Sequence, residues 1–410
     1  MRTGAEVVIV GGGVFGCSVA AHLAERGQRD LLLLEAGEIG AQTSSQAAGH
    51  VQFLRPRDDL TEMARYGLSV FPDFARVTGQ DIGFHRSGSL RLGLTPERAD
   101  EMNRQVAAAR RLGVPLEPIL PPEAKRLMPL LEMKGILAAT FAAGDGYIAD
   151  PRSVAVGYAA RARALGAATE VGIRVGSLVV EGGRVRGVTT ERGSVAAGQV
   201  VLAAGAWSPG LAALAGFGLP AVPVRHQLQV TGPIPGIAAD QPVTRFPDKN
   251  VYLRPEPPGL IVGAFEAQPS SFDIRAQPTF DPHTQLEPNL AGLNRYVASI
   301  LPFVPSLANV PVLRYQKGLP TFTPDHLPLI GPIPGINGLV VACGCCASGI
   351  AFAPAVGRLV AELVLGQRPF VDVKPFALDR FGSASADLTA LRAACERVYA
   401  SYYTVDEGTR

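Results

Sequence analysis

Three glycines near the start of the chain have the spacing of a phosphate-binding turn. Gly11, Gly13 and Gly16 form a G-x-G-x-x-G pattern, and Glu35 follows the last of them by 19 residues. In such a turn the first glycine allows a tight bend, the second lets a pyrophosphate approach the backbone, and the third lets helix and strand pack closely. A carboxylate at Glu35 can accept hydrogen bonds from a ribose diol. These residues predict a dinucleotide site, and the acid argues against a 2′-phosphate.

The elements that must position these residues are visible on either side of the glycines. Residues 7–10 are apolar and β-branched, which predicts a strand buried on both faces. Residues 17–26 show an apolar helical stripe, and residues 31–34 predict a second strand. The helix start brings Val14 and Phe15 to the nucleotide together with its free N–H groups, and Ala36 follows the acid. The unit alone does not distinguish NAD from FAD.

Two distant segments decide which cofactor is expected. VVLAAGAWSP, residues 200–209, is a strand that ends at Ala204 and Gly205, with Trp207 just beyond. Residues 338–363 repeat the order of strand, glycine-rich loop and helix, with Ser348 and Gly349 before Ile350 where the helix begins. An NAD site rarely needs three separated segments, whereas a long and enclosed FAD does. The sequence therefore predicts FAD.

Composition narrows the class of protein. The chain has 410 residues, a hydrophobic fraction of 47% and a formal net charge of +2, which is typical of a globular protein without a nucleic-acid partner. The five cysteines include a CGCC cluster, but no second Cys/His pair offers the spacing of a metal site, so no metal is expected. Without an apolar leader or a spanning segment, the expectation is a cytoplasmic protein with no membrane insertion.

The chain divides into alternating segments. The expected cofactor domain is discontinuous and comprises residues 1–80, 145–220 and 317–380. The expected substrate domain comprises residues 81–144 and 221–316, where strand-like segments alternate with proline, and it includes a helix near 284–301. Residues 381–410 form a helical tail. Asp150 and Pro151 have the positions of a helix cap and a first helical residue.

Taken together, these motifs resemble the D-amino-acid-oxidase-like, or glutathione-reductase-type-2, flavoenzymes over nearly the whole chain. The resemblance rests on the first glycine motif, the RVGSL strand, VVLAAGAWS, KGLPTFTPDHLPLIGPIPGINGLVVACG and SGIAFAPAVGRLVAEL. PVRHQLQVTGPIPG, VYLRPEPPGLIVGAFE and DVKPFALDRF are similar to the dimethylglycine and sarcosine dehydrogenase branch. The tail LRAACERVYASYYTVDEG resembles the segment that leads into the folate-binding half of those proteins, a half that this chain lacks.

The resemblance implies an α/β fold class, with an FAD-binding Rossmann-like domain and a discontinuous substrate domain built on an antiparallel sheet. It implies oxidation of a carbon beside an amine nitrogen by hydride transfer to FAD, and then hydrolysis of the imine. The flavin does the redox step, and the protein supplies position and electrostatics. The implied substrate is a secondary or tertiary N-alkyl amino acid or an imino acid.

Residues of the flavin site follow from the resemblance. Ser44 and Ser45 correspond to the loop that meets the pyrophosphate and ribityl chain, and Ala48, Gly49 and His50 to the part that passes the flavin ring. Val175, in the RVGSL strand, belongs to the same family pattern.

Four side chains are the candidates for substrate binding and catalysis. Arg55 corresponds to an arginine that binds substrate carboxylate in monomeric sarcosine oxidases, although it could equally be a solvated loop charge. Tyr252 and Arg254 alternate on one expected strand and so share a face, which is either the roof over the flavin or a plain sheet surface. His226 could tune the site near neutral pH or be a structural histidine.

Departures from the family pattern refine these expectations. Gln46 occupies the position of the histidine that carries covalent flavin in dimethylglycine-dehydrogenase-like proteins, and GLPTFTPD contains no cysteine, so FAD is expected to be noncovalent. Ile261 and Ala351 replace two lysines of monomeric sarcosine oxidases, which argues against sarcosine itself and against rapid oxidase activity. Lys317 is a possible substitute by position.

Two alternatives remain open from the sequence. One is a D-amino-acid or glycine oxidase or dehydrogenase that acts on a primary amine. The other is a flavoprotein electron-relay subunit of a larger complex. The expected partners are a small-molecule amine or amino acid and either oxygen, an electron-transfer protein or a partner subunit.

Overall fold

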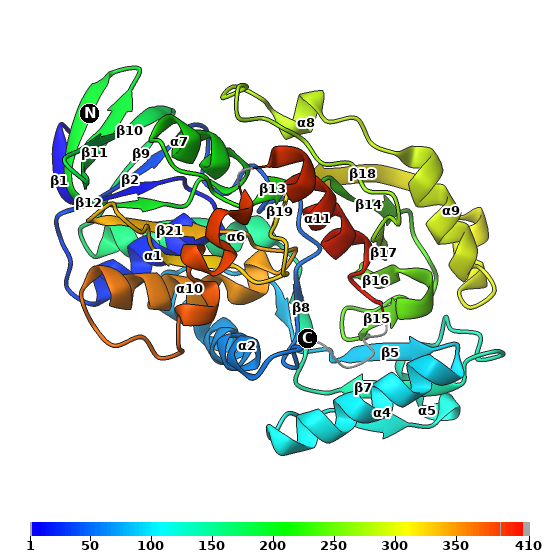
Figure 1. The fold of residues 1–410 in the computed structure, drawn as a ribbon. Coiled ribbons are helices and arrows are strands. Elements are labelled where there is room, and N and C mark those ends of the chain that lie inside the picture. The colour runs from blue at the N-terminus through cyan, green and yellow to red at the C-terminus, as the bar shows by residue number, and fades with distance from the viewer. Residues whose placement is uncertain (1, 386, 405–410) are drawn as a thin grey trace.

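The computed structural model describes residues 2–385 and 387–404. Its first sheet carries the glycine motif, and its strand order is β10-β11-β12-β1-β2-β9, with β21 paired to β12 and β20 to β21 (Figure 1). The strands β21, β12, β1, β2 and β9 are parallel to one another. The bounds are β1 (Gly4–Val10), β2 (Leu31–Glu35), β9 (Ala168–Val171), β10 (Val175–Glu181), β11 (Arg184–Thr190), β12 (Gly193–Leu202), β20 (Leu329–Pro332) and β21 (Leu339–Cys343).

Both faces of this sheet are covered, as its apolar strands require. Val7 and Ile9 of β1 pack into the core on one face, and Val8 and Val10 pack into the core on the other. On the first face α1 packs against α6 and α10, and α2 packs against α10 (Figure 1). On the second face α7 contacts β10. These helices are α1 (Val14–Glu25), α2 (Asp58–Val70), α6 (Pro151–Ala164), α7 (Ser208–Leu214) and α10 (Gly349–Val364). Asp150 caps α6 as the sequence predicts.

The second sheet has the order β18-β14-β17-β16-β15-β5-β7-β6 and is antiparallel except where β15 pairs with β5. Its strands are β5 (Ser89–Gly93), β6 (Glu117–Ile119), β7 (Ala138–Ala142), β14 (His226–Thr231), β15 (Val243–Phe246), β16 (Val251–Glu256), β17 (Gly259–Ala264) and β18 (Val312–Gly318). The helices α4 (Pro96–Arg111), α5 (Pro121–Leu127) and α9 (Leu290–Ile300) contact this sheet.

The helix predicted near 284–301 is interrupted. The structure has α8 (Pro282–Gln285) and α9 as separate helices. Pro288 lies between them, and the residue before a proline is disfavoured in the helical conformation. Asn289 then starts α9 by accepting a hydrogen bond from the N–H of Gly292 at 3.0 Å.

Short elements and the last helix join the two sheets. The pairs β3 (His50–Val51) with β8 (Gly146–Ile148), and β8 with β4 (Phe84–His85), form one small sheet, and β13 (Val222–Pro223) pairs with β19 (Thr321–Phe322). The helix α11 (Leu388–Ala400) packs on β13 and β19, between the two large sheets (Figure 1). A short helix, α3 (Phe74–Thr78), contacts α6. Within the described residues, none of the helices combines the length and the apolar character that crossing a membrane requires.

Candidate active site

A cavity of about 810 Å³ is lined by residues from both sheets and from the C-terminal segment. It contains most of the residues that the sequence predicts for cofactor contact, in one continuous wall: Gly11, Gly13, Val14, Phe15, Glu35, Ala36, Ser44, Ala48, Gly49, His50, Val175, Ala204, Gly205, Trp207, Ser348, Gly349 and Ile350. Segments more than three hundred residues apart in the sequence therefore meet around a single space.

The glycine motif shows why each of its three positions lacks a side chain. Gly11 has φ +107°, and a Cβ atom there would lie 2.5 Å from the carbonyl oxygen of Ala203. A Cβ atom on Gly16 would lie 1.9 Å from the carbonyl oxygen of Gly11, so Gly16 serves close packing and does not line the cavity. A Cβ atom on Gly13 would meet only Ser44 Oγ, at 3.6 Å. No atom of the described residues therefore requires a glycine at position 13. The open space beside it, at the start of α1, fits a pyrophosphate.

Glu35 ends β2 with its carboxylate fixed by the backbone. Oε2 accepts a hydrogen bond from the N–H of Gly12 at 2.6 Å, and Oε1 accepts one from the N–H of Gly37 at 2.7 Å. A carboxylate can accept about four hydrogen bonds, so each oxygen retains capacity for another donor. Because Glu35 also lines the cavity, it fits the ribose diol of a dinucleotide.

The two serines of the loop after β2 differ in their positions. Ser44 Oγ accepts a hydrogen bond from the N–H of Val14 at 3.1 Å, which places it at the start of α1 and in the cavity wall. Ser45 Oγ instead donates to the carbonyl oxygens of Ala41 and Gln42, and Ser45 is absent from the cavity wall. The Ser45 hydroxyl thus stabilises the loop, while Ser44 is the serine that lines the cavity.

Several buried polar atoms in the cavity wall lack a hydrogen-bond partner among the described residues. They include Trp207 Nε1, His50 Nε2 and Gln42 Oε1. Leaving such an atom buried and unpaired costs about 1–3 kcal/mol, so buried polar atoms are normally paired. These atoms, together with the open space at Gly13, fit a polar cofactor that spans the cavity.

His226 connects two tyrosine hydroxyls at the other end of the cavity. Its Nε2 lies 2.7 Å from the hydroxyl of Tyr252, and its Nδ1 lies 2.9 Å from the hydroxyl of Tyr399. Burial lowers the pKa of His226 to about 4, so the imidazole is neutral at neutral pH. Burial also raises the pKa of Tyr252 and of Tyr399, which keeps both phenols protonated. This Tyr252–His226–Tyr399 row is a chain of neutral groups that can pass a proton.

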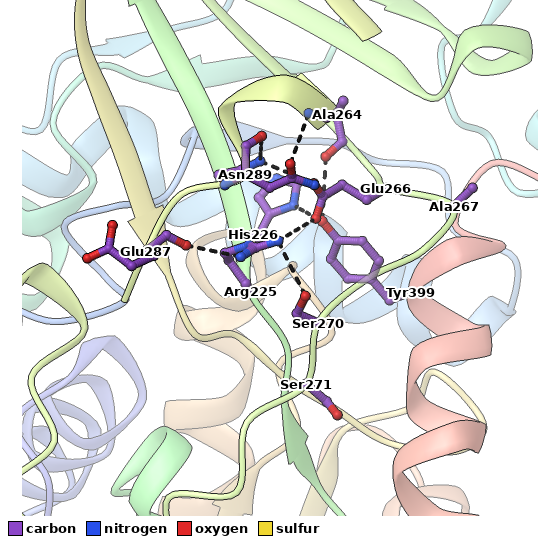
Figure 2. Close-up of polar contacts among 12 residues, drawn as sticks. Arg225, His226, Ala264, Glu266, Ala267, Ser270, Ser271, Glu287, Asn289 and Tyr399 are labelled. Atoms are coloured by element: carbon purple, nitrogen blue, oxygen red, sulfur yellow. Dashed lines mark hydrogen bonds and ion pairs between the residues drawn. The ribbon is translucent and has the colours of Figure 1, made fainter. Parts of the chain in front are cut away.

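Behind this row lies a buried ion pair. Arg225 Nη2 is 3.4 Å from Glu266 Oε2, and Glu266 Oε1 accepts hydrogen bonds from Gln227 and Asn289 (Figure 2). Figure 2 shows His226 and Tyr399 beside this pair. The network holds β14 to Glu266, just after β17, and to Asn289 at the start of α9, and so fixes the strand that carries His226.

Arg55 and Arg254 occupy different kinds of place. Arg55 lines the cavity, where its Nη1 donates to Ser348 Oγ at 3.2 Å and its guanidinium lies 4.8 Å from the centre of the Phe352 ring. Arg254 is 1% exposed and does not line the cavity. It shares a face with Tyr252, as the alternation predicts, but its Nε donates to the carbonyl oxygen of Ala48 at 2.6 Å. The structure therefore places Arg254 outside the cavity wall, where it holds the loop at Ala48.

The structure adds residues that sequence reasoning missed. Arg245 of β15 is 4% exposed and lines the cavity, with Nη2 3.4 Å from His50 Nδ1. It is the register partner of Tyr252 across β15 and β16, a relationship that only the strand pairing reveals. Tyr402 and Tyr403, beyond α11, also line the cavity. The sequence offered one signal for Arg245, which is that a charged residue stands in the largely apolar segment PVTRF. Lys317, by contrast, lies outside the cavity wall.

Residues 6–363 match the family described as FAD dependent oxidoreductase (DAO). The chain belongs to this family. FAD is therefore its cofactor, and the α/β fold class and the family resemblance that the sequence predicts are both confirmed. The binding segments fit FAD, since Gly13 and the unpaired atoms of the cavity face the space that the cofactor would fill.

Similar proteins include enzymes longer than this chain. Mitochondrial dimethylglycine dehydrogenase of Rattus norvegicus is 34% identical over 386 residues, which cover 92% of this chain and 45% of that protein. 4-Methylaminobutanoate oxidase (formaldehyde-forming) of Paenarthrobacter nicotinovorans is 32% identical over 407 residues, covering 98% and 49%. The chain thus spans about half the length of these relatives. The crystal structure of L-proline dehydrogenase from P. horikoshii matches with a TM-score of 0.83 and 27% identity, covering 94% of this chain and 99% of that one.

Proposed function

We propose that this FAD-dependent oxidoreductase oxidises the C–N bond of a secondary or tertiary N-alkyl amino acid or of an imino acid. The observation that carries the proposal is the meeting, in one cavity with the FAD-binding segments, of the Arg55 guanidinium and the neutral Tyr252–His226 pair. The names of two similar proteins specify N-methylated amino acids, and that of a third specifies the imino acid proline.

In this proposal FAD, when bound, accepts the hydride that leaves the carbon beside nitrogen. Arg55 holds the substrate carboxylate, because a guanidinium presents donors that match a carboxylate in a bidentate fashion. The residues around the flavin end are buried, and the nearby arginines are cationic, so both effects favour the neutral form of the substrate amine. A neutral amine is the form whose lone pair can assist departure of the hydride.

A substrate that enters as an ammonium ion must lose one proton from nitrogen before the hydride can leave. The hydroxyl of Tyr252 can accept that proton as its own proton passes to Nε2 of His226, which becomes an imidazolium hydrogen-bonded to Tyr399. Because the pKa of His226 is lowered to about 4, the imidazolium gives the proton up readily to the water that enters for hydrolysis. Water then hydrolyses the iminium to an amine and a carbonyl compound.

Anaerobic mixing of the FAD-loaded protein with a panel of amines tests this proposal. N-methylglycine, N,N-dimethylglycine and L-proline should bleach the flavin faster than glycine or D-alanine. Bleaching by the primary amines alone would favour a D-amino-acid or glycine oxidase or dehydrogenase, and bleaching by none would favour an electron-relay subunit. Tyr252→Phe should slow bleaching by about 10²-fold, as for loss of a general acid–base group, while substrate affinity changes less.

A further inference from the structure

Two arginines that face the cavity lack a carboxylate partner, unlike the other buried arginines. Arg98, Arg225 and Arg254 each form an ion pair with an acidic side chain. For Arg55 and Arg245, no carboxylate of the described residues lies within 4.0 Å of the guanidinium. A buried charge without a counter-charge is costly, and proteins normally pair such charges. Two unpaired cations in the wall of one cavity therefore point to an anionic ligand.

The groups that do contact Arg245 are neutral. When the amide of Gln52 is oriented with its oxygen toward the guanidinium, that oxygen lies 2.7 Å from Nη1 and 2.7 Å from Nη2. Tyr403 also forms a side-chain hydrogen bond with Arg245. His50 is a further neighbour, and burial, aided by the charge of Arg245, lowers its pKa well below the usual value, so the imidazole is neutral. These contacts orient the guanidinium and do not neutralise its charge.

Asp145 is a buried acid whose charge acts on both Arg55 and Arg245, but its oxygens are hydrogen-bonded to other groups. Asp145 Oδ2 accepts a hydrogen bond from Ser89 Oγ at 2.5 Å, and Oδ1 accepts one from the N–H of Phe53 at 2.8 Å. Burial raises the pKa of Asp145, while the charges of Arg245 and Arg55 act in the opposite direction, so this one carboxylate is shared between two guanidiniums and pairs directly with neither. A ligand with a single carboxylate would pair directly with one guanidinium and leave the other without a carboxylate in contact.

The two cations enter the cavity from different elements. Arg55 follows β3 and is held against α10 through Ser348 and Phe352. Arg245 lies on β15 of the second sheet, opposite Tyr252 in the strand register. Both line the same cavity; burial lowers the pKa of Arg55, and the charge of Arg245 lowers it further. An amine between them would have one acidic group directed to each side.

We propose that the substrate is a secondary amine that carries two carboxylates, one bound by Arg55 and the other by Arg245. This inference rests on the proposed oxidation of an N-substituted amino acid and specifies its substrate class. Arg245 then discriminates dicarboxylates from monocarboxylates, while the Tyr252–His226 pair serves the nitrogen common to both.

Iminodiacetate and N-methylglycine form a matched pair of probes, because both are secondary amines and they differ by one carboxylate. Anaerobic stopped-flow mixing of each amine with the FAD-loaded protein gives the rate constant of flavin reduction and the Kd of the amine. The ratio of rate constant to Kd should be at least about 100-fold higher for iminodiacetate than for N-methylglycine, the effect expected of a buried charge pair. Arg245→Met should abolish most of this ratio, and Arg245→Lys should restore part of it. Arg76→Met, at an arginine of which 73% of the side chain is exposed, is the control that should leave the ratio unchanged.

The inert analogues thiodiacetate and (methylthio)acetate test binding without oxidation. Thiodiacetate should perturb the flavin spectrum at a concentration about 100-fold lower than (methylthio)acetate does, and Arg245→Met should remove the difference. If thiodiacetate binds in this way while no amine bleaches the flavin, the two-anion site stands and the proposed oxidation fails. Equal reduction by iminodiacetate and N-methylglycine, or an equal loss of both in Arg245→Met and Arg245→Lys, would overturn the inference.

Discussion

Replacing Gly13 by alanine should separate cofactor binding from folding. Gly13 has φ −73° and ψ −178°, which alanine adopts without strain, and the new methyl group would contact only Ser44 Oγ at 3.6 Å. As Gly13 is the cap of α1, alanine should change the free energy of unfolding of the FAD-free protein by less than about 1 kcal/mol. With FAD bound, the same methyl group occupies space that a phosphate needs. Overpacking of this kind costs about 1–3 kcal/mol, which weakens FAD binding by about 5- to 150-fold.

Two measurements on the same protein check this prediction. Thermal unfolding followed by circular dichroism gives the stability of the FAD-free variant, and quenching of flavin fluorescence in a titration gives Kd for FAD. Gly16→Ala is the matched control, because its Cβ atom would lie 1.9 Å from the carbonyl oxygen of Gly11 and should cost more than about 3 kcal/mol in folding. If Gly13→Ala bound FAD as tightly as the parent protein, or unfolded like Gly16→Ala, the assignment of this space to the pyrophosphate would be refuted.

Three further outcomes are expected. Acid precipitation should release all of the flavin into the supernatant, because the loop carries Gln46, whose amide is not a nucleophile that could hold flavin covalently. Flavin that stays with the pellet would contradict this. The pKa of His226 is about 4 in the folded protein, against about 6.5 in the unfolded chain. The free energy of unfolding therefore decreases as the pH falls from 6.5 toward 4, because the unfolded chain binds the proton first. In urea unfolding, His226→Asn should remove up to about 3 kcal/mol of this pH dependence. Arg254 and Arg314 both pair with Glu256, but only Arg254 is buried. In the same unfolding assay, Arg254→Met should lower the free energy of unfolding by about 3 kcal/mol, and Arg314→Met by less than about 0.5 kcal/mol. Equal losses would contradict the role assigned to Arg254.

The nucleotide half of the site was predictable because local pattern and chemistry coincide there. The spacing of Gly11, Gly13 and Gly16 specifies a turn, and the apolar runs on either side specify the strand and helix that form it. The role of Glu35 was predictable because it ends β2, the parallel neighbour of the strand that leads into the glycine turn. None of these inferences needs knowledge of which distant strands pair.

The substrate half depends on such pairing, and there the sequence was insufficient. Alternation correctly puts Tyr252 and Arg254 on one face of β16, yet it does not reveal that the loop at Ala48 covers the arginine. Arg245 emerges only from the register between β15 and β16. Likewise Ser44 and Ser45 are adjacent and chemically identical, and only the path of the loop decides that the first reaches α1.

The position of Tyr399 on the last helix has a consequence for biosynthesis. The hydroxyl that orients His226, and the rings of Tyr402 and Tyr403 that close the wall, emerge from the ribosome hundreds of residues after the glycine turn. The FAD-binding segments, which extend to Ile350 at the start of α10, are therefore all synthesised before Tyr399. Under the proposed function, a chain that ends between α10 and α11 would keep the segments that line the FAD site but would lack the Tyr399 hydroxyl that contacts His226.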